Sequence, residues 1–202
     1  MIRLHDNLTS GNGFKIRLLL SQLGISYQRV EYDIDKAETR TPAFLAMNPN
    51  GRVPLLELEG GQFLAESDAI LWYLADGTPF LPQAPLERAE VLQWMFFEQY
   101  SHEPNIATVR FWITHRVEMT ADRQTMLPLK MKQGHAALAV MEQHLAARPF
   151  FVGGRYSIAD VALYAYTHVA GEGGFDLGSY PSVRAWLARV AAQPGYVPIT
   201  RG

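Results

Sequence analysis

The sequence of 202 residues contains no cysteine. The chain therefore has no disulfide, no thiolate ligand for a metal ion, and no thiol nucleophile of its own. Proteins of reducing compartments commonly lack disulfides, so the absence fits a cytoplasmic location. The first residues, Met1–Asp6, turn polar too early for a signal peptide, which also predicts the cytoplasm.

Long apolar runs and an excess of one charge are also missing. No run approaches the ~20 apolar residues of a membrane-spanning helix, so no membrane association is expected. The 18 basic and 20 acidic residues give a net charge of −2. Nucleic-acid-binding domains usually carry a basic excess, so no nucleic-acid partner is expected. The six histidines show neither a His-x-x-x-His pair nor an HExxH helix, and no metal site is expected.

Two parts of the chain differ in their residue pattern. The first part alternates strand and helix signals, in the order βαβ, a short helix, then ββα. Its predicted strands cover 2–5, 27–32, 53–58 and 62–65, and its predicted helices 14–24, 42–47 and 67–75. The second part is helical almost throughout, with helices predicted at 86–101, 106–116, 122–147, 157–170 and 182–193. We expect a small α/β domain over residues 1–80 and an all-helical domain over 86–202.

A proline within the second part predicts an interruption. Inside a helix a proline costs ~3 kcal/mol and breaks the hydrogen-bond ladder, so Pro104 predicts a kink or break around residues 102–105. Glu103 and Arg110 are seven residues apart and face the same way if the helix resumes in register. A buried ion pair that fixes the kink is favoured over a direct catalytic role for them.

A polar loop, residues 9–13, joins the first predicted strand to the first predicted helix. The start of a helix exposes unpaired N–H groups and a partial positive charge, and so favours anions. The Ser10 hydroxyl and the Asn12 amide add donors, and Gly11 and Gly13 let a ligand approach the backbone closely. The loop matches neither a dinucleotide fingerprint nor a P-loop. The alternative is that Ser10 or Asn12 only caps the helix.

Three further motifs lie along the chain. Pro54 cannot donate to a sheet and so marks the start of a strand; if its bond to Val53 were cis, the turn would present the Val53 backbone to an extended peptide. An ordinary turn is the alternative. Ser67 is expected to cap the next helix, with Glu66 adding negative charge beside it. The segment Ser157-Ile158-Ala159-Asp160 is a capping box before a buried helix.

The order and spacing of these motifs resemble the cytosolic glutathione transferase family over essentially the whole chain. The resemblance implies a thioredoxin-like α/β N-terminal domain followed by an all-α C-terminal domain. It also implies glutathione as co-substrate, a small hydrophobic electrophile as second substrate, no metal, and a homodimer. The stretch Phe97–Pro104 resembles one found in a bacterial subgroup of the family.

The resemblance implies roles for residues that match the family's motifs. Val53, before a cis Pro54, would pair with the cysteinyl backbone of glutathione. Glu66 would meet the γ-glutamyl ammonium, and Ser67 its carboxylate. A basic side chain usually meets the glycyl carboxylate, and the candidate that adjoins the Val-Pro turn is favoured. The candidates are Arg52, the favoured one, Arg40 and Lys36.

The thiol is expected near the start of the first helix. No tyrosine lies in residues 1–26 and the chain has no cysteine, which excludes the tyrosine and cysteine types of the family. Ser10 resembles the catalytic serine of theta and zeta types. The Ser10-Gly11-Asn12-Gly13 loop also resembles the Thr-Pro-Asn-Gly loop of nu-type bacterial members, in which disulfide reduction is prominent. Either Ser10 or Asn12 is therefore expected to hold the thiolate.

The electrophile site is expected between the domains, with three aromatic side chains as candidate walls. These are Tyr100, Phe111 and Trp112, for which a place in the core is the alternative. The leading interpretation is a glutathione transferase. A glutathione-dependent disulfide reductase or peroxidase, and a non-catalytic interaction module, are the alternatives.

Overall fold

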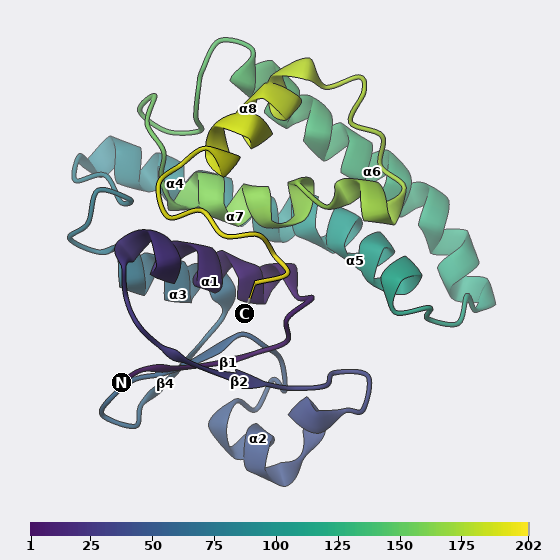
Figure 1. Ribbon diagram of the computed structural model, residues 1–202. Coiled ribbons are helices and arrows are strands. Elements are labelled where there is room, and N and C mark those ends of the chain that lie inside the picture. The colour runs from purple at the N-terminus through teal and green to yellow at the C-terminus, as the bar shows by residue number, and fades with distance from the viewer. Residues whose placement is uncertain (202) are drawn as a thin grey trace. The chain divides into compact units, whose positions relative to one another are not determined.

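The computed structural model describes residues 1–201 (Figure 1). The chain divides into two compact units. The first comprises Met1–Thr78 together with the C-terminal segment from Gln193, and the second comprises Pro79–Ala192. Among the helices of residues 1–201, none is both long and apolar enough to cross a membrane.

The first unit is built on a four-stranded sheet of order β2-β1-β3-β4. Strand β1 pairs in parallel with β2 and antiparallel with β3, and β3 pairs antiparallel with β4. Helices α1 and α3 lie on one face of this sheet and α2 on the other (Figure 1). The elements are β1 (Arg3–Asp6), α1 (Gly11–Leu23), β2 (Gln28–Glu31), a 3-10 turn η1 (Glu38–Arg40), α2 (Pro42–Met47), β3 (Leu55–Glu57), β4 (Phe63–Ala65) and α3 (Ser67–Ala75). This is the thioredoxin-like arrangement that the sequence predicted.

Helix α1 shows how closely residue chemistry determines an element. It starts three residues before the predicted residue 14, because the Ser10 hydroxyl accepts the Gly13 N–H at 3.2 Å and caps the helix from there. It ends at Gly24, whose left-handed conformation (φ 66°) costs little for a residue without a Cβ. Phe14, Leu18 and their apolar neighbours are fully buried.

The C-terminal segment lies with the first unit, whereas we expected the helical domain to run to residue 202. The physical reason is a buried arginine on α1. The Arg17 guanidinium donates hydrogen bonds to the carbonyls of Ile199 at 2.7 Å and Arg201 at 2.6 Å. These carbonyls satisfy donors that water cannot reach, since Arg17 is only 1% exposed.

The second unit is all-helical, as predicted. Its elements are α4 (Pro85–Phe97), a π-helical turn η2 (Glu98–His102), α5 (Glu103–Thr114), α6 (Ala121–Leu145), α7 (Ile158–Thr167), a 3-10 turn η3 (Ala170–Gly173) and α8 (Pro181–Ala191). The interruption was predicted around residues 102–105, but the structure has a π-helical turn just before them, at Glu98–His102, which joins α4 to α5 without a coil. Pro104 lies in the first turn of α5, where a missing N–H removes no helical hydrogen bond.

A single carboxylate organises the core of the helical unit. Asp160 is completely buried and accepts hydrogen bonds from the Ser157 N–H at 3.0 Å, the Phe151 N–H at 3.2 Å and the Trp186 indole at 2.9 Å. Burial raises its pKa to about 7, against the lowering effect of these donors. The predicted capping box is confirmed. Asp160 thereby joins the start of α7 to α8, which carries Trp186, and to the loop before α7, which carries Phe151.

Candidate functional site

The predicted loop places Ser10 at the N-cap of α1. Its hydroxyl oxygen accepts the Gly13 N–H with one lone pair, as the capping interpretation required. The hydroxyl hydrogen is a separate donor, so capping the helix and donating to a ligand are compatible. Ser10 is half-buried and stands where the first N–H groups of α1 concentrate positive potential.

The starts of α1 and α3 meet at a chain of polar contacts. The Ser67 hydroxyl, on α3, donates to Asn12 Oδ1, on α1, at 3.3 Å. The Lys15 ammonium donates to Ser67 Oγ at 3.2 Å and forms an ion pair with Asp68 Oδ1 at 3.0 Å. The structure therefore brings together Asn12 and Ser67, which are 55 positions apart.

Lys15 was missed in the sequence, although a signal was present. It lies three residues after Asn12, which puts both on one face of a helix. A lysine within the apolar run from Phe14 to Leu20 marks a buried charge, and buried charges need a partner. Its side chain is fully buried.

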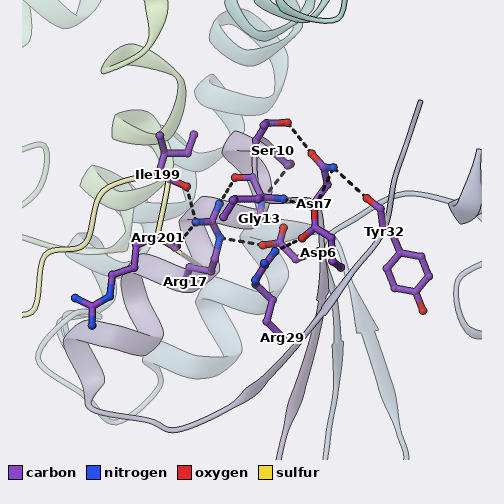
Figure 2. Close-up of polar contacts among 12 residues, drawn as sticks. Asp6, Asn7, Ser10, Gly13, Arg17, Arg29, Tyr32, Ile199 and Arg201 are labelled. Carbon is purple, nitrogen blue, oxygen red and sulfur yellow. Dashed lines mark hydrogen bonds and ion pairs between the residues drawn. The ribbon is translucent and has the colours of Figure 1, made fainter. Parts of the chain in front are cut away.

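A second buried ion pair lies beneath the loop (Figure 2). Asp6, at the end of β1, meets Arg17 Nε with Oδ2 at 2.9 Å. Burial raises the pKa of Asp6 to about 6, although the Arg17 charge acts in the opposite direction. Burial likewise lowers the pKa of Arg17. Arg17 also donates to the Leu8 carbonyl at 2.6 Å, so the same guanidinium holds both the strand end and the loop.

Gly13 lies directly over this pair. A Cβ at this position would stand 1.6 Å from Asp6 Oδ1. The start of α1 therefore packs on the carboxylate with no room for a side chain, and the glycine is required by close approach rather than by backbone conformation.

The Val53–Pro54 bond is cis, the geometry that the resemblance implied. Strand β3 begins at Leu55, so Val53 precedes the paired register of the sheet. The turn before it is held by Asn48, whose amide donates to the Arg52 carbonyl at 2.8 Å. Arg40 reaches the same turn and donates to the Asn50 carbonyl at 2.9 Å.

The three basic candidates for the glycyl carboxylate thus differ. Arg52 is exposed beside the Val-Pro turn, and Arg40 is exposed and anchored to that turn. Lys36 forms an ion pair with Asp33 at 2.8 Å, and this contact raises the pKa of Lys36. Which of them meets a carboxylate at this turn stays a prediction.

Glu66 adopts a strained backbone conformation, with φ 66° and ψ 115°. Such conformations cost about 1–3 kcal/mol in residues other than glycine and cluster at functional sites. Glu66 is the residue that precedes α3, and Ser67 is the first residue of the helix, so the expectation that Ser67 is the N-cap is wrong by one position. The Asn50 amide donates to Glu66 Oε1 at 3.4 Å and links the Val-Pro turn to the start of α3.

The aromatic candidates in the helical unit have different surroundings. Tyr100 is 87% exposed and lines a cavity of about 400 Å³ with Phe97, Asn105 and Val140. Neither Phe111 nor Trp112 lines that cavity. Phe111 packs on the ring of His115, with centroids 4.4 Å apart, whereas Trp112 is buried. Their role at an electrophile site stays a prediction.

Among residues 1–201, no group of three or more His, Asp and Glu side chains is arranged to hold a metal ion.

Comparison with known families agrees with this geometry. Residues 1–76 match the glutathione S-transferase N-terminal domain, and residues 94–194 match the glutathione S-transferase C-terminal domain. The chain belongs to the glutathione S-transferase family. Both halves match, so the membership covers the thioredoxin-like unit and most of the helical one.

Three proteins with different printed names are similar to this chain over most of its length. A crystal structure of glutathione S-transferase from Pseudomonas fluorescens is 50% identical, covers 99% of both chains and has a TM-score of 0.95. The disulfide-bond oxidoreductase YfcG of Escherichia coli is 30% identical over 91% of this chain and 87% of its own. Ure2p in complex with glutathione is 25% identical, covers 100% of this chain and 93% of its own, and has a TM-score of 0.87.

The contact of Gly13 with Asp6 yields a first prediction. We expect Gly13→Ala to lower the free energy of unfolding by about 2–4 kcal/mol, because the methyl group meets a carboxylate that Arg17 holds in place. Urea unfolding followed by circular dichroism measures the change. Gly171→Ala is the matched control, since its added Cβ would meet nothing within 4 Å apart from its own local backbone and chain neighbours, and it should change stability by less than about 0.5 kcal/mol. Equal stability of the two variants would contradict the proposed packing.

Proposed function

We propose that this protein is a glutathione transferase, which ionises the thiol of bound glutathione and directs it at a small hydrophobic electrophile. The observation that carries the proposal is the meeting of Asn12 with Ser67, where the starts of α1 and α3 come together. The Asn50–Glu66 contact connects this point to the cis Val53–Pro54 turn. Donors for a thiolate, an ammonium acceptor and a peptide-pairing backbone thus belong to one unit.

Glutathione offers a charged group at each end, and the chain has a complementary group for each. The Glu66 carboxylate suits the γ-glutamyl ammonium. The Ser67 hydroxyl and the first N–H groups of α3 suit the γ-glutamyl carboxylate, because these N–H groups have no partner within the helix. Arg52 or Arg40 suits the glycyl carboxylate. Pairing of the cysteinyl backbone with Val53 would place the sulfur toward the start of α1.

The chemical step in which side chains of this protein take part is the stabilisation of the glutathione thiolate. A free thiol has a pKa of ~8.5, so little thiolate exists at neutral pH. Each unit of lowering requires ~1.4 kcal/mol, which is within reach of one charge-assisted hydrogen bond. Ser10, Asn12 and the N–H groups of the first turn of α1 are the donors. The thiolate sulfur then forms a bond to an electrophilic carbon, and the leaving group departs with its electron pair.

The helical unit is proposed to supply the walls of the electrophile pocket, with Tyr100, Phe111 and Trp112 as candidates. The homodimer implied by the family resemblance and the cytoplasmic location expected from the sequence remain predictions.

Removal of the Ser67 hydroxyl tests the binding site. We expect Ser67→Ala to raise the Kd for glutathione about 10- to 100-fold, since a hydrogen bond to a charged group contributes ~1.5–3 kcal/mol. Isothermal titration calorimetry gives both constants. Ser26→Ala, an exposed serine of the same unit, is the control and should bind as the wild type does. Wild-type protein that fails to bind millimolar glutathione would refute the proposed function.

Removal of the thiolate donors tests the activation step. We expect Ser10→Ala and Asn12→Ala each to raise the pKa of the bound thiol by about one unit, because each removes one donor. The ultraviolet absorbance of the thiolate, followed against pH at saturating glutathione, gives this pKa. If neither variant changes it, the two residues serve only to shape the start of α1.

Disulfide reduction is a second candidate function. It is favoured by the similarity to YfcG, whose name is disulfide-bond oxidoreductase. The chain has no cysteine, so the attacking sulfur must be that of glutathione. In this reaction the glutathione thiolate attacks a disulfide, forms a mixed disulfide and expels one substrate sulfur as a thiolate. A second glutathione thiolate then attacks the glutathione sulfur of the mixed disulfide, which forms oxidised glutathione and expels the other substrate sulfur as a thiolate.

Parallel assays separate the two functions. The first follows glutathione conjugation of 1-chloro-2,4-dinitrobenzene, and the second follows glutathione-dependent reduction of 2-hydroxyethyl disulfide. A transferase should give the higher kcat/KM with the aryl halide, and a disulfide reductase with the disulfide. Ser67→Ala should lower both activities, because both use the same bound glutathione. No activity with either substrate, together with normal glutathione binding, would favour a non-catalytic module.

A further inference from the structure

A cavity of about 360 Å³ lies within the first unit, beside β2, the edge strand of the sheet. Three segments line it: α1, the chain at the start of β2, and the C-terminal segment. The lining residues are Arg17, Ser21, Tyr27, Arg29, Val197 and Arg201. Cavities of this size accommodate small organic molecules, and the chemistry of the lining determines which kind.

The cavity is distinct from the proposed glutathione site. None of the residues proposed to bind glutathione lines it. Ser10 caps the start of α1, whereas Ser21 lies in its last turn. At a rise of ~1.5 Å per residue, these two positions are about 16 Å apart along the helix. A ligand in the cavity therefore occupies a site of its own.

The three arginines of the lining lie close together, one on each segment (Figure 2). Burial raises the pKa of the Tyr27 phenol, and the charges of Arg17, Arg29 and Arg201 each act in the opposite direction. Burial lowers the pKa of Arg17, and the nearby charge of Arg29 lowers it further. All three guanidiniums are thus within electrostatic range of one hydroxyl group.

Three like charges around one cavity repel one another unless anions offset them. Two carboxylates do so: Asp6 pairs with Arg17 Nε at 2.9 Å, and Glu31 pairs with Arg29. Among residues 1–201, no carboxylate pairs with the exposed Arg201 guanidinium. Within the described part of the chain, the cavity therefore has one more cation than the carboxylates that pair with its lining.

The donors of the lining suit a tetrahedral anion. Arg17 is already bonded to Asp6 and to three carbonyl oxygens, so it contributes mainly charge. Arg29 and Arg201 offer planar forks that match phosphate or carboxylate oxygens. A phosphate monoester has three terminal oxygens that do not share a plane with its phosphorus, so it can accept from several segments at once. A carboxylate has two oxygens in one plane and reaches fewer of them.

We propose that this cavity binds a small phosphate monoester. Arg29 and Arg201 donate to the phosphate oxygens, Arg17 adds its charge, and the organic group packs on the Tyr27 ring and Val197. The bound anion would tie the C-terminal segment to the edge of the sheet. The site is independent of the proposed function, because it shares no residue with the glutathione site.

Phenyl phosphate is the probe for the first test, in a buffer without phosphate. We expect isothermal titration calorimetry to give saturable binding with a Kd of about 1 mM or lower. Arg201→Gln should raise this Kd about 10-fold, because it removes a charged donor but keeps the backbone carbonyl that accepts from Arg17. Arg184→Gln, which changes net charge equally at an exposed arginine outside the cavity, is the control. No binding at about 10 mM, or equal Kd values for wild type and Arg201→Gln, would overturn the proposal.

A titration at saturating glutathione separates the two sites. The Kd for phenyl phosphate should stay the same with and without glutathione. A Kd that rises more than about 10-fold would show that phenyl phosphate occupies the glutathione site, and the proposal would fail. If the protein binds no glutathione, the proposed function fails, and the comparison of wild type with Arg201→Gln still decides whether the phosphate site exists.

Three related anions test the chemistry of the ligand. Phenyl sulfate keeps the shape but carries one charge, benzoate has a planar carboxylate, and inorganic phosphate lacks the organic group. We expect each to bind at least about 3-fold more weakly than phenyl phosphate. Benzoate or phenyl sulfate that binds as tightly would contradict a site for a doubly charged tetrahedral anion. Inorganic phosphate that binds as tightly would contradict packing of the organic group on Tyr27 and Val197.

Hydrogen exchange locates the bound probe. Phenyl phosphate should slow amide exchange in the C-terminal segment and at the start of β2, because it bridges the two. The Arg201→Gln variant should lose this protection at the same probe concentration, and Arg184→Gln should keep it. Protection confined to the start of α1 or to α3 would place the probe elsewhere and overturn the proposal.

Discussion

The Arg17 guanidinium is the contact on which the first unit depends. It is buried, pairs with the Asp6 carboxylate, and donates to the carbonyls of Leu8, Ile199 and Arg201. One side chain thereby joins the end of β1, the loop before α1 and the C-terminal segment. Its five N–H donors form a rigid fork that matches such a set of acceptors, which a lysine could not match. The loop that carries Ser10 is positioned from beneath by this contact.

The candidate site on top of this contact is assembled from three separate segments. The start of α1 provides donors, the turn around Val53 provides an accessible backbone, and the start of α3 provides Glu66 and Ser67. Each link between segments is a polar contact of moderate length: Asn50 with Glu66 at 3.4 Å, and Ser67 with Asn12 at 3.3 Å. Contacts of this length exchange readily for contacts with a charged ligand, whereas the shorter bonds of Arg17 hold the frame.

Features determined by local chemistry could be predicted from the sequence. The bounds of α2 were predicted without error, because Pro42 starts the helix and Asn48-Pro49 ends it. The Ser157–Asp160 capping box and the two-domain class were also predicted correctly. The predictions that failed depend on contacts between residues that are far apart in the sequence. Two partners of Arg17, the carbonyls of Ile199 and Arg201, lie more than 180 residues away, and no periodicity encodes those contacts.

The candidate site could likewise be predicted only where short local motifs determine it. Ser10, Asn12 and Ser67 were found because their motifs are short and local, although the cap of α3 was displaced by one residue. Lys15 is buried where α1 packs against α3, and Glu66 contacts Asn50 of the Val-Pro turn; pattern reasoning on one helix alone reveals neither contact. A lysine among apolar residues was visible, but its partner on α3 was not.

The π-helical turn at Glu98–His102 bears on how the helical unit tolerates change in chain length. A π turn is an α-helix with one residue inserted, and each residue of an α-helix turns the chain by about 100°. The wider π turn absorbs the extra residue, so α5 continues with Ile106 and Val109 in the core, and loss of one residue here would restore a regular helix with the same face internal. Without such a turn, one extra residue in a regular helix would rotate α5 by about 100° and take these side chains out of the core.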